Sequence, residues 1–236
     1  MFALLALSAC DDSPSLTHYV LALSWEPAFC EFNADKQECA ELDSADFAAS
    51  NLTVHGLWPN DRPDGGPSYC DVDAATKALD EPESWCELPE PKVSEKTRAA
   101  LAPAMPGVES CLDRHEWIKH GTCAKLDADA YFKNAVRLAA EIQATPLGQV
   151  IERNIGRYAT PQQLANGFEV AYGAGASKAL TLVCTSRGSQ YVLTEVRIAL
   201  EPSALEHRLG RGDLHIDGDP PAGSCPDDMR IDRAGP

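Results

Sequence analysis

Residues 114–123 bring two imidazoles, a carboxylate and an ammonium together within a short stretch of the chain. On a helix with 100° per residue, four ionisable side chains fall within an arc of about 140°: His115, Glu116, Lys119 and His120. The two apolar side chains between them point the opposite way. One ionisable face and one apolar face predict a helix that lines a cleft.

Two ordinary explanations of this stretch compete with a catalytic one. A charge run is most often a solvated surface, but two histidines and a tryptophan are unusual on such a surface. A zinc helix is the second, because metalloprotease helices carry His-Glu-x-x-His with the histidines four residues apart. Here His115 and His120 are five apart and diverge by about 140° on an ideal helix. We therefore expect no zinc here.

A third imidazole comes from a separate segment, residues 52–60, which reads Leu-Thr-Val-His-Gly-Leu-Trp-Pro-Asn. On a strand, Leu52 and Val54 would lie on one face and His55 on the other. Residues 61–69 are rich in Pro and Gly and predict a loop. Because Leu52 and Val54 are apolar and would face the core, His55 would point away from it.

Imidazoles from two segments, with a carboxylate and an ammonium, are what phosphoryl transfer without a metal requires. One neutral imidazole takes a proton from the attacking oxygen, and a protonated one gives a proton to the leaving oxygen. Cations stabilise the charge that develops on the phosphoryl oxygens. Histidine suits both proton roles because its unperturbed pKa is near 6.5.

Composition limits the classes of protein that fit. The 236 residues, 44% of them hydrophobic, are enough for one large domain. A formal charge of −16 argues against a protein that binds nucleic acid by general charge neutralisation. A nuclease with positive potential confined to its cleft remains compatible with it. No apolar run approaches the length of a membrane-spanning helix.

Nine cysteines without any Cys-x-x-Cys pair argue against zinc ribbons and thioredoxin-like sites. The odd one is Cys10, because residues 7–10, Leu-Ser-Ala-Cys, resemble a bacterial lipobox in which the cysteine carries a lipid. An ordinary signal peptide is the alternative. The segment lacks a basic start, so we expect the true initiation site upstream. The eight other cysteines predict four disulfides in an exported protein.

The chain is expected to comprise a signal segment at 1–10, a tether at 11–16 and one catalytic domain at 17–236. The predicted fold class is α+β: a central antiparallel sheet flanked by several helices in a single disulfide-bonded domain. We expect a strand over 18–25 and a hairpin of 179–184 and 190–200, in which one face of the second strand is buried. The tail from Pro202 onward is polar and rich in Pro and Gly, and Cys225 is expected to pin it. Helices are predicted after Ser94 to Ala102 with a stop at Pro103, from Asp127 or Asp129 to Gln143, and from Thr160 to Gly173.

Residues 55–59, His-Gly-Leu-Trp-Pro, and 115–123, His-Glu-Trp-Ile-Lys-His-Gly-Thr-Cys, resemble the two active-site segments of the ribonuclease T2 family. These are secreted acid endoribonucleases. The resemblance implies that His55 is the general acid on the leaving 5′-oxygen and His120 the general base on the ribose 2′-hydroxyl. It implies cleavage of single-stranded RNA to 2′,3′-cyclic phosphates and then 3′-phosphates, with no cofactor and no metal.

The resemblance also assigns the other motif residues. His115 is expected to bind phosphate, while Glu116 and Lys119 position and stabilise the pentacovalent phosphorus. Trp58 is expected to stack on a base, and stacking tolerates every base, which implies low base specificity. Fungal members carry Asp where this chain has Asn60, so base preference is open. RNA is the expected partner, DNA is not, and a monomer is expected.

Disulfide pairing rests mainly on the same resemblance. Spacing makes Cys30 and Cys39 natural partners, and the family suggests Cys70 with Cys123. Several relatives have a cysteine where this chain has Ala199, so Cys184 is left with Cys225. Elimination then pairs Cys86 with Cys111.

Two other functions stay open on sequence alone. A catalytically silent RNA- or ligand-binding protein could retain the fold, although every polar residue of the motifs is present. A metal-dependent phosphoesterase would need a clustered Asp/His ligand set, which the sequence does not show. His18, His207 and His215 match no motif and are expected to be structural or solvated.

Overall fold

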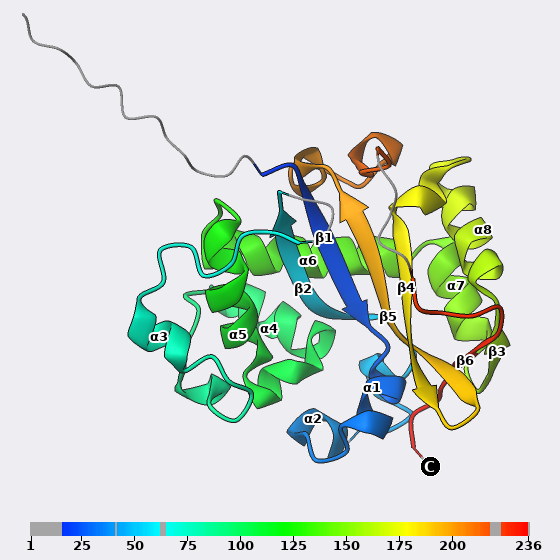
Figure 1. The fold of residues 1–236 in the computed structure, drawn as a ribbon, viewed down its shortest axis with the longest axis horizontal. Helices are drawn as coiled ribbons and strands as arrows, with labels where there is room; N and C mark the ends of the chain where they lie inside the picture. The colour runs from blue at the N-terminus through cyan, green and yellow to red at the C-terminus, as the bar shows by residue number, and fades with distance from the viewer. Residues whose placement is uncertain (1–15, 41, 62–64, 218–222, 236) are drawn as a thin grey trace, which may run out of the picture.

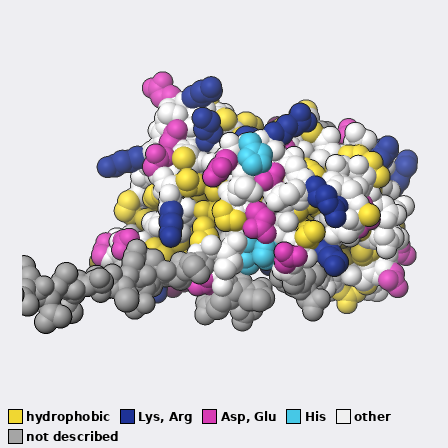
Figure 2. All heavy atoms as spheres, turned by 90° about the horizontal axis from the view of Figure 1, so that it is seen from above, with side chains coloured by type: hydrophobic (Ala, Val, Ile, Leu, Met, Phe, Trp, Pro, Cys, Tyr) yellow, Lys and Arg dark blue, Asp and Glu magenta, His cyan; other side chains and the backbone are white. Residues whose placement is uncertain are grey.

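The computed structural model describes residues 16–40, 42–61, 65–217 and 223–235. The expected lipobox with Cys10, and the tether up to residue 15, lie outside the described residues. Among the described residues, no helix is both long and apolar enough to cross a membrane. On the described surface seen from above, acidic and basic side chains are interspersed and form no continuous basic tract (Figure 2).

A six-stranded sheet forms the centre of the molecule, with strand order β2-β1-β5-β6-β3 and β4 paired with β5 (Figure 1). Its pairs are antiparallel except for β5 and β6, which meet in parallel at Val192 and Arg230. The sheet is therefore mainly, but not wholly, antiparallel. The strands are β1 His18–Ser24, β2 Thr53–Asn60, β3 Arg157–Ala159, β4 Leu180–Arg187, β5 Gln190–Leu200 and β6 Met229–Ile231.

Helices flank this sheet on several sides, which confirms the predicted α+β class. In Figure 1, α6 passes behind the sheet, α3, α4 and α5 lie beyond β2, and α7 and α8 lie at the opposite flank. The helices are α1 Glu26–Phe32, α2 Gln37–Ala40, α3 Ala74–Ala78, α4 Glu95–Ala104, α5 Leu112–Lys119, α6 Ala128–Gln143, α7 Pro146–Arg153 and α8 Pro161–Tyr172.

The core lies between the sheet and α6. Helix α6 buries Tyr131, Phe132 and Leu138 completely, and strand residues such as Leu21 and Leu57 belong to the same apolar cluster. Burying a side chain of this size contributes about 1.5–3 kcal/mol relative to leaving it exposed. Because α6 also contacts β2, this packing fixes the strand that carries His55.

Helix starts follow the capping signals in the sequence. Ser94 and Asp127 each accept a hydrogen bond from the backbone N–H three residues on, and Thr160 forms a capping box with Gln163. Pro103 does not stop α4 as predicted, since the helix runs to Ala104 with the proline in its last turn. A proline there removes only one backbone hydrogen bond, and helix ends vary by a residue or two.

The hairpin differs from expectation in detail, and the tail adds a short strand. Strands β4 and β5 do form an antiparallel hairpin, with Gly188 in the left-handed region at φ 62° in its turn. However, β5 buries residues on both faces, because Leu193 and Glu195 are buried as well as the predicted face. The polar tail contributes a further strand, β6, with Met229 and Ile231 fully buried. A three-residue strand is too short to show periodicity.

Two β-bulges interrupt the sheet near its centre. In β2, Gly56 pairs with Ala22 and Val54 with Leu23, so His55 is the extra residue opposite β1. In β5, Glu195 pairs with Val183 and Leu193 with Cys184, so Thr194 is extra opposite β4. Bulges re-aim side chains and are common beside active sites.

Four disulfides staple the described chain, and they are the pairs that the family resemblance implies. The longest spans 53 residues between Cys70 and Cys123 and ties the loop after β2 to the end of α5. The others join Cys30 to Cys39, Cys86 to Cys111 and Cys184 to Cys225.

Candidate active site

The two sequence motifs meet where β2 faces α5. His55 Nε2 lies 3.6 Å from Glu116 Oε1, and Trp58 Nε1 donates to Glu116 Oε2 at 2.8 Å. The ring of Trp58 lies 5.5 Å from that of His120, and the rings of His115 and His120 are 6.4 Å apart. The predicted residues therefore surround one point, with the Glu116 carboxyl at its floor.

Gly56 allows this approach of strand and helix. A Cβ at Gly56 would lie 2.0 Å from Glu116 Oε2 and 2.4 Å from Trp58 Nε1. These distances are far inside van der Waals contact, so any side chain would displace the carboxyl. The glycine between His55 and Trp58 is thus a steric requirement of the site.

His55 is held by a carboxylate from β5. Its Nδ1 forms a 2.6 Å hydrogen bond with Glu195 Oε1, and the other oxygen of Glu195 accepts from Arg197 Nε at 2.5 Å. Burial by itself would lower the pKa of His55, but this hydrogen bond and the charges of Glu116 and Glu195 together raise it above its usual value. The same contacts hold the pKa of Glu195 below its usual value despite burial.

His115 has a carboxylate partner of its own. Its Nδ1 lies 2.6 Å from Asp80 Oδ1, and Tyr69 donates to the other oxygen of Asp80 at 2.8 Å. Its ring stacks on Trp85, with the centroids 4.4 Å apart. Burial nonetheless outweighs Asp80 and lowers the pKa of His115. The contacts with Asp80 and Trp85 fix the orientation of the His115 ring.

His120 is the exception among the three imidazoles. Helix α5 ends at Lys119, and His120 is its C-terminal cap. Tyr69 N–H donates to Lys119 O at 2.8 Å, which anchors this helix end. Burial, followed by the positive charges of Lys119, His115 and His55, lowers the pKa of His120 to about 3. His120 is therefore neutral throughout the ordinary acidic range.

Gly121 lies where a helix often takes a left-handed C-terminal glycine. Here it is part of a short 3₁₀ turn with Thr122 and Cys123 and is not among the residues with positive φ. A Cβ there would lie 2.3 Å from the Trp117 ring, so the glycine serves packing. Trp117 in turn packs edge-on against Tyr131 of α6.

Glu116 is almost inaccessible, with 1% of its surface exposed. Burial raises its pKa to about 7, although His55 and the Trp58 hydrogen bond favour the ionised form. Among the described residues, the ion pairs of Glu116 are to His55 and His115 and none is to Lys119. At acidic pH this carboxyl is largely protonated and can donate a hydrogen bond.

The prediction that His115 and His120 diverge too far to share a metal ion is wrong. Ligand atoms of His115, Glu116 and His120 lie within 4.8 Å of one another, because His120 follows the end of the helix. The charge of Lys119, which lowers the pKa of both histidines, opposes a further cation. A second such group, Glu26 with Cys30 and Cys39, has both sulfurs in a disulfide. We assign no metal to either.

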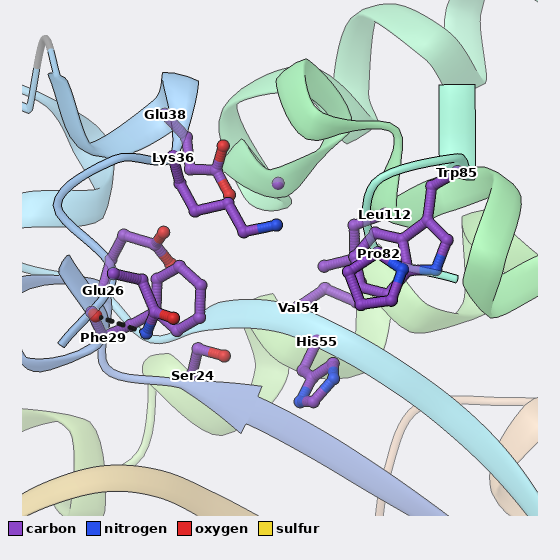
Figure 3. Close-up of a pocket in the computed structure, with 12 residues that line it drawn as sticks. Ser24, Glu26, Phe29, Lys36, Glu38, Val54, His55, Pro82, Trp85 and Leu112 are labelled. Carbon is purple, nitrogen blue, oxygen red and sulfur yellow. Dashed lines mark hydrogen bonds between the residues drawn. The ribbon is translucent and has the colours of Figure 1, made fainter. Parts of the chain in front are cut away.

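A pocket of about 290 Å³ opens beside His55 (Figure 3). Ser24 and His55 form its floor, Pro82 and Trp85 stand on one side, and Lys36 extends toward its centre from the other. Its wall also contains two buried carboxyls, Glu26 and Glu38. Burial raises the pKa of Glu26 to about 7.

Sequence reasoning missed the residues that hold the histidines. Glu195 and Arg197 lie in a strand predicted from its apolar alternation, and Asp80 and Trp85 lie in a proline-rich stretch without helical or strand periodicity. The one local signal was two charges, at 195 and 197, inside an otherwise apolar run.

The remaining histidines lie apart from this site, with structural partners. His18 is buried and stacks on His215, with centroids 4.4 Å apart, and His215 pairs with Glu201. His207 pairs with Asp213.

Comparison with known proteins agrees with the geometry. The family model described as the ribonuclease T2 family matches residues 16–209. Ribonuclease I of Escherichia coli is 33% identical over 235 residues, which cover 92% of this chain and 86% of that protein. Intracellular ribonuclease LX of Solanum lycopersicum is 30% identical over 131 residues, 55% of this chain and 50% of that protein.

Solved structures share the fold at low sequence identity. Ribonuclease MC1 from bitter gourd seeds has a TM-score of 0.61 and 19% identity, covering 91% of this chain and 99% of that one. Ribonuclease NT in complex with 5′-AMP has a TM-score of 0.56 and 17% identity, covering 93% and 99%. With the two motifs joined in one site and the family model matching most of its length, this chain belongs to the ribonuclease T2 family.

Proposed function

We propose that the protein is a metal-independent endoribonuclease of low base specificity that cleaves single-stranded RNA through attack by the ribose 2′-hydroxyl. The observation that carries this proposal is the convergence of His55 and His120 on the Glu116 carboxyl, with His55 Nε2 3.6 Å and a ring nitrogen of His120 within 4.8 Å of a Glu116 oxygen. The opposite directions of the two pKa shifts support it. The pKa of His55 is raised and that of His120 is lowered to about 3. Titratable groups whose pKa values are pushed apart mark the acid and the base. The matched relatives bear ribonuclease names, and one solved neighbour binds 5′-AMP.

In the first step, neutral His120 takes the proton of the 2′-hydroxyl as its oxygen attacks phosphorus. The bond from phosphorus to the 5′-oxygen breaks, and protonated His55 gives its proton to that oxygen. The products are a 2′,3′-cyclic phosphate and a free 5′-hydroxyl. His120 ends the step protonated and His55 neutral, so the net number of protons is unchanged.

In the second step the roles exchange. His55 takes a proton from water and the water oxygen attacks the cyclic phosphate. The bond from phosphorus to the 2′-oxygen breaks, and His120 returns its proton to that oxygen. A 3′-phosphate remains and both histidines recover their starting states. The exchange is the consequence of microscopic reversibility.

Groups around Glu116 stabilise the charge that develops on phosphorus. Glu116, largely protonated at acidic pH because its pKa is about 7, donates to a phosphoryl oxygen. Lys119 supplies a cation, and His115, oriented by Asp80, binds phosphate. Trp58 offers an aromatic face for a base beside the reacting phosphate.

The pocket beside His55 is suited to the base of the leaving nucleotide. His55 protonates the oxygen of that nucleotide, and the pocket begins at His55 (Figure 3). Its size and its mixture of aromatic, acidic and basic groups suit a planar polar ring.

We further propose that the protein acts outside the cytoplasm as a monomer, with a lipid on Cys10. The four disulfides support an oxidising compartment. Mass spectrometry of the mature protein from its host tests the lipid, and light scattering tests the monomer. An unmodified residue at the mature N-terminus contradicts the lipid anchor.

The decisive experiment asks which oxygen attacks. RNA is expected to yield 2′,3′-cyclic ends early, and a strand with one 2′-deoxy residue is expected to resist at that linkage. DNA resists throughout, and EDTA leaves the rate unchanged. Early products with linear phosphates, cleavage of DNA at a comparable rate, or EDTA inhibition reversed by added metal contradicts the mechanism.

A further inference from the structure

We infer that Glu195 is a positioning residue for His55: its carboxylate holds the Nδ1–H of the ring, so that Nε2 faces the reacting phosphate. The inference rests on the proposed function for its catalytic meaning and on geometry for the rest. The Nδ1–Glu195 distance is 2.6 Å, while Nε2 points to the α5 side, 3.6 Å from Glu116. The two ring nitrogens therefore have separate tasks.

Glu195 is itself fixed in place. Its side chain is 8% exposed, and its second oxygen accepts from Arg197 at 2.5 Å. The Arg197 guanidinium lies over the ring of Trp58, 5.1 Å from its centroid. A buried carboxylate with one oxygen on a cation and the other on an imidazole has little rotational freedom. The ring of His55 takes its orientation from this arrangement.

The sheet is shaped to let His55 and Glu195 meet. They come from β2 and β5, and β1 runs between these strands. At this level β1 carries Ala22 and Ser24, whose small side chains leave room for contact across the strand. The bulge residue of β2 is His55 itself, and that of β5 precedes Glu195. The backbone is therefore irregular at His55 and directly before Glu195, which re-aims both side chains relative to a regular strand.

The contact has a consequence for both steps of the reaction. When His55 is protonated, Nε2–H is available to the leaving oxygen. When His55 is neutral, the proton stays on Nδ1 against Glu195, so Nε2 is free to accept a proton from water. Without the carboxylate, neutral His55 could carry its proton on Nε2 and would then be unable to act as base.

Several charged groups face His55, and Glu195 differs from all of them. Glu116 has a pKa of about 7 and is mostly neutral at acidic pH, whereas the pKa of Glu195 is lowered. Glu195 is thus the anion that persists beside His55 under acidic conditions. The groups facing His55 are Glu195 and Arg197 on β5, Glu116 and His115 on α5, His120 at the C-terminal cap of α5, and Glu26 on α1.

The test replaces the charge while keeping the shape, with Glu195→Gln. Glu201→Gln is the matched control, because Glu201 holds His215 Nδ1 at 2.7 Å outside the site. Histidine-labelled protein without RNA is titrated by NMR. In the wild type, neutral His55 is expected to carry its proton on Nδ1. Glu195→Gln is expected to lower the pKa of His55, and Glu201→Gln to leave it unchanged.

Kinetics on a dinucleotide give the second measurement. Glu195→Gln is expected to lower kcat on the order of 10–10²-fold with little change in KM, as removal of an orienting partner does. The falling limb of the pH–rate profile should move to lower pH by the same amount as the NMR pKa. Glu195→Asp, which retains the charge, should recover part of both effects.

The outcomes separate the two proposals. A His55 pKa that is unchanged in Glu195→Gln, even with a lower kcat, means a structural role only and overturns the inference. If neither variant at 195 folds, the wild-type tautomer decides, and a proton on Nε2 overturns it. If His55 titrates as expected but no cyclic phosphate forms from RNA, the proposed function fails while the orientation of the ring stands.

Discussion

The sheet side and the helix side of the active site treat histidine in opposite ways. On the sheet side, His55 sits in a strand beside Glu195, and its pKa is raised. On the helix side, His120 follows α5 among cationic neighbours, and its pKa is lowered to about 3. In the proposed mechanism the same side chain is therefore the acid on one side and the base on the other. The environment, and not the residue type, makes the assignment.

The largest effect is expected from removing either imidazole. His55→Ala and His120→Ala should each reduce kcat/KM by a factor on the order of 10²–10⁴. The double variant should lose less than the product of the two factors, because the residues act as a unit. Initial rates of cyclic phosphate formation measure this. A fully multiplicative loss would show that the two sides work independently.

The next effect comes from forcing the two sides apart. Gly56→Ala puts a methyl group 2.0 Å from Glu116 Oε2, so strand and carboxyl must separate. A displacement of about 1 Å at such a site can cost on the order of 10²-fold in rate. Gly188→Ala is a control in the hairpin turn, where a Cβ would meet nothing within 4 Å. Its strain from positive φ should affect stability and leave the rate intact. Equal rates for Gly56→Ala and wild type would refute the close approach.

The pH dependence of the cleavage rate reports the different pKa values of His120 and His55 directly. The base works above its pKa, so the rate should rise with pH through about 3, where His120 loses its proton. The acid works below its pKa, so the rate should fall as pH rises through the raised pKa of His55. Lys119→Met should move the rising limb, which reports His120, to higher pH by up to about one unit. The shift is limited because burial is the larger cause of the lowered pKa of His120 and remains in the variant. A rising limb at the same pH in the variant would mean that the charge of Lys119 does not lower the pKa of His120.

The smallest effect is on the stability of the fold, and it is measured without substrate. Burial raises the pKa of Glu26 from 4.5 to about 7, so the folded state holds this proton more tightly than the unfolded state. That stability is fully present below pH 4.5 and is lost as pH rises to about 7. Glu26→Gln should therefore match the wild type at pH 4 and be more stable at pH 8, on the order of 2 kcal/mol.

Chemical denaturation at the two pH values measures this difference. Glu83→Gln, an exposed carboxyl, is the control and should leave stability unchanged at both. If Glu26→Gln is no more stable than the wild type at pH 8, the buried carboxyl is not the source of the pH dependence.

Local signals in the sequence were sufficient for much of the fold. Ser94, Asp127 and Thr160 start helices because their side chains satisfy free N–H groups at helix starts. Apolar runs placed β1 and the β4–β5 hairpin. The two motifs placed His55, Glu116 and His120 in one site, since their residue types match one family over consecutive positions. The three-residue strands β3 and β6 carry too little pattern to be predicted.

By itself, the sequence determined which side chains were available for chemistry and that the chain folds as α+β. Only the tertiary structure decided what state each would be in. Glu195 lies 140 positions from His55, and Asp80 lies 35 from His115, so no local pattern links them. A pKa depends on burial and on charges within a few ångströms, and only the folded chain brings those neighbours together. Gly56 and Gly121 likewise gain their meaning from Glu116 and Trp117, which the fold places against them.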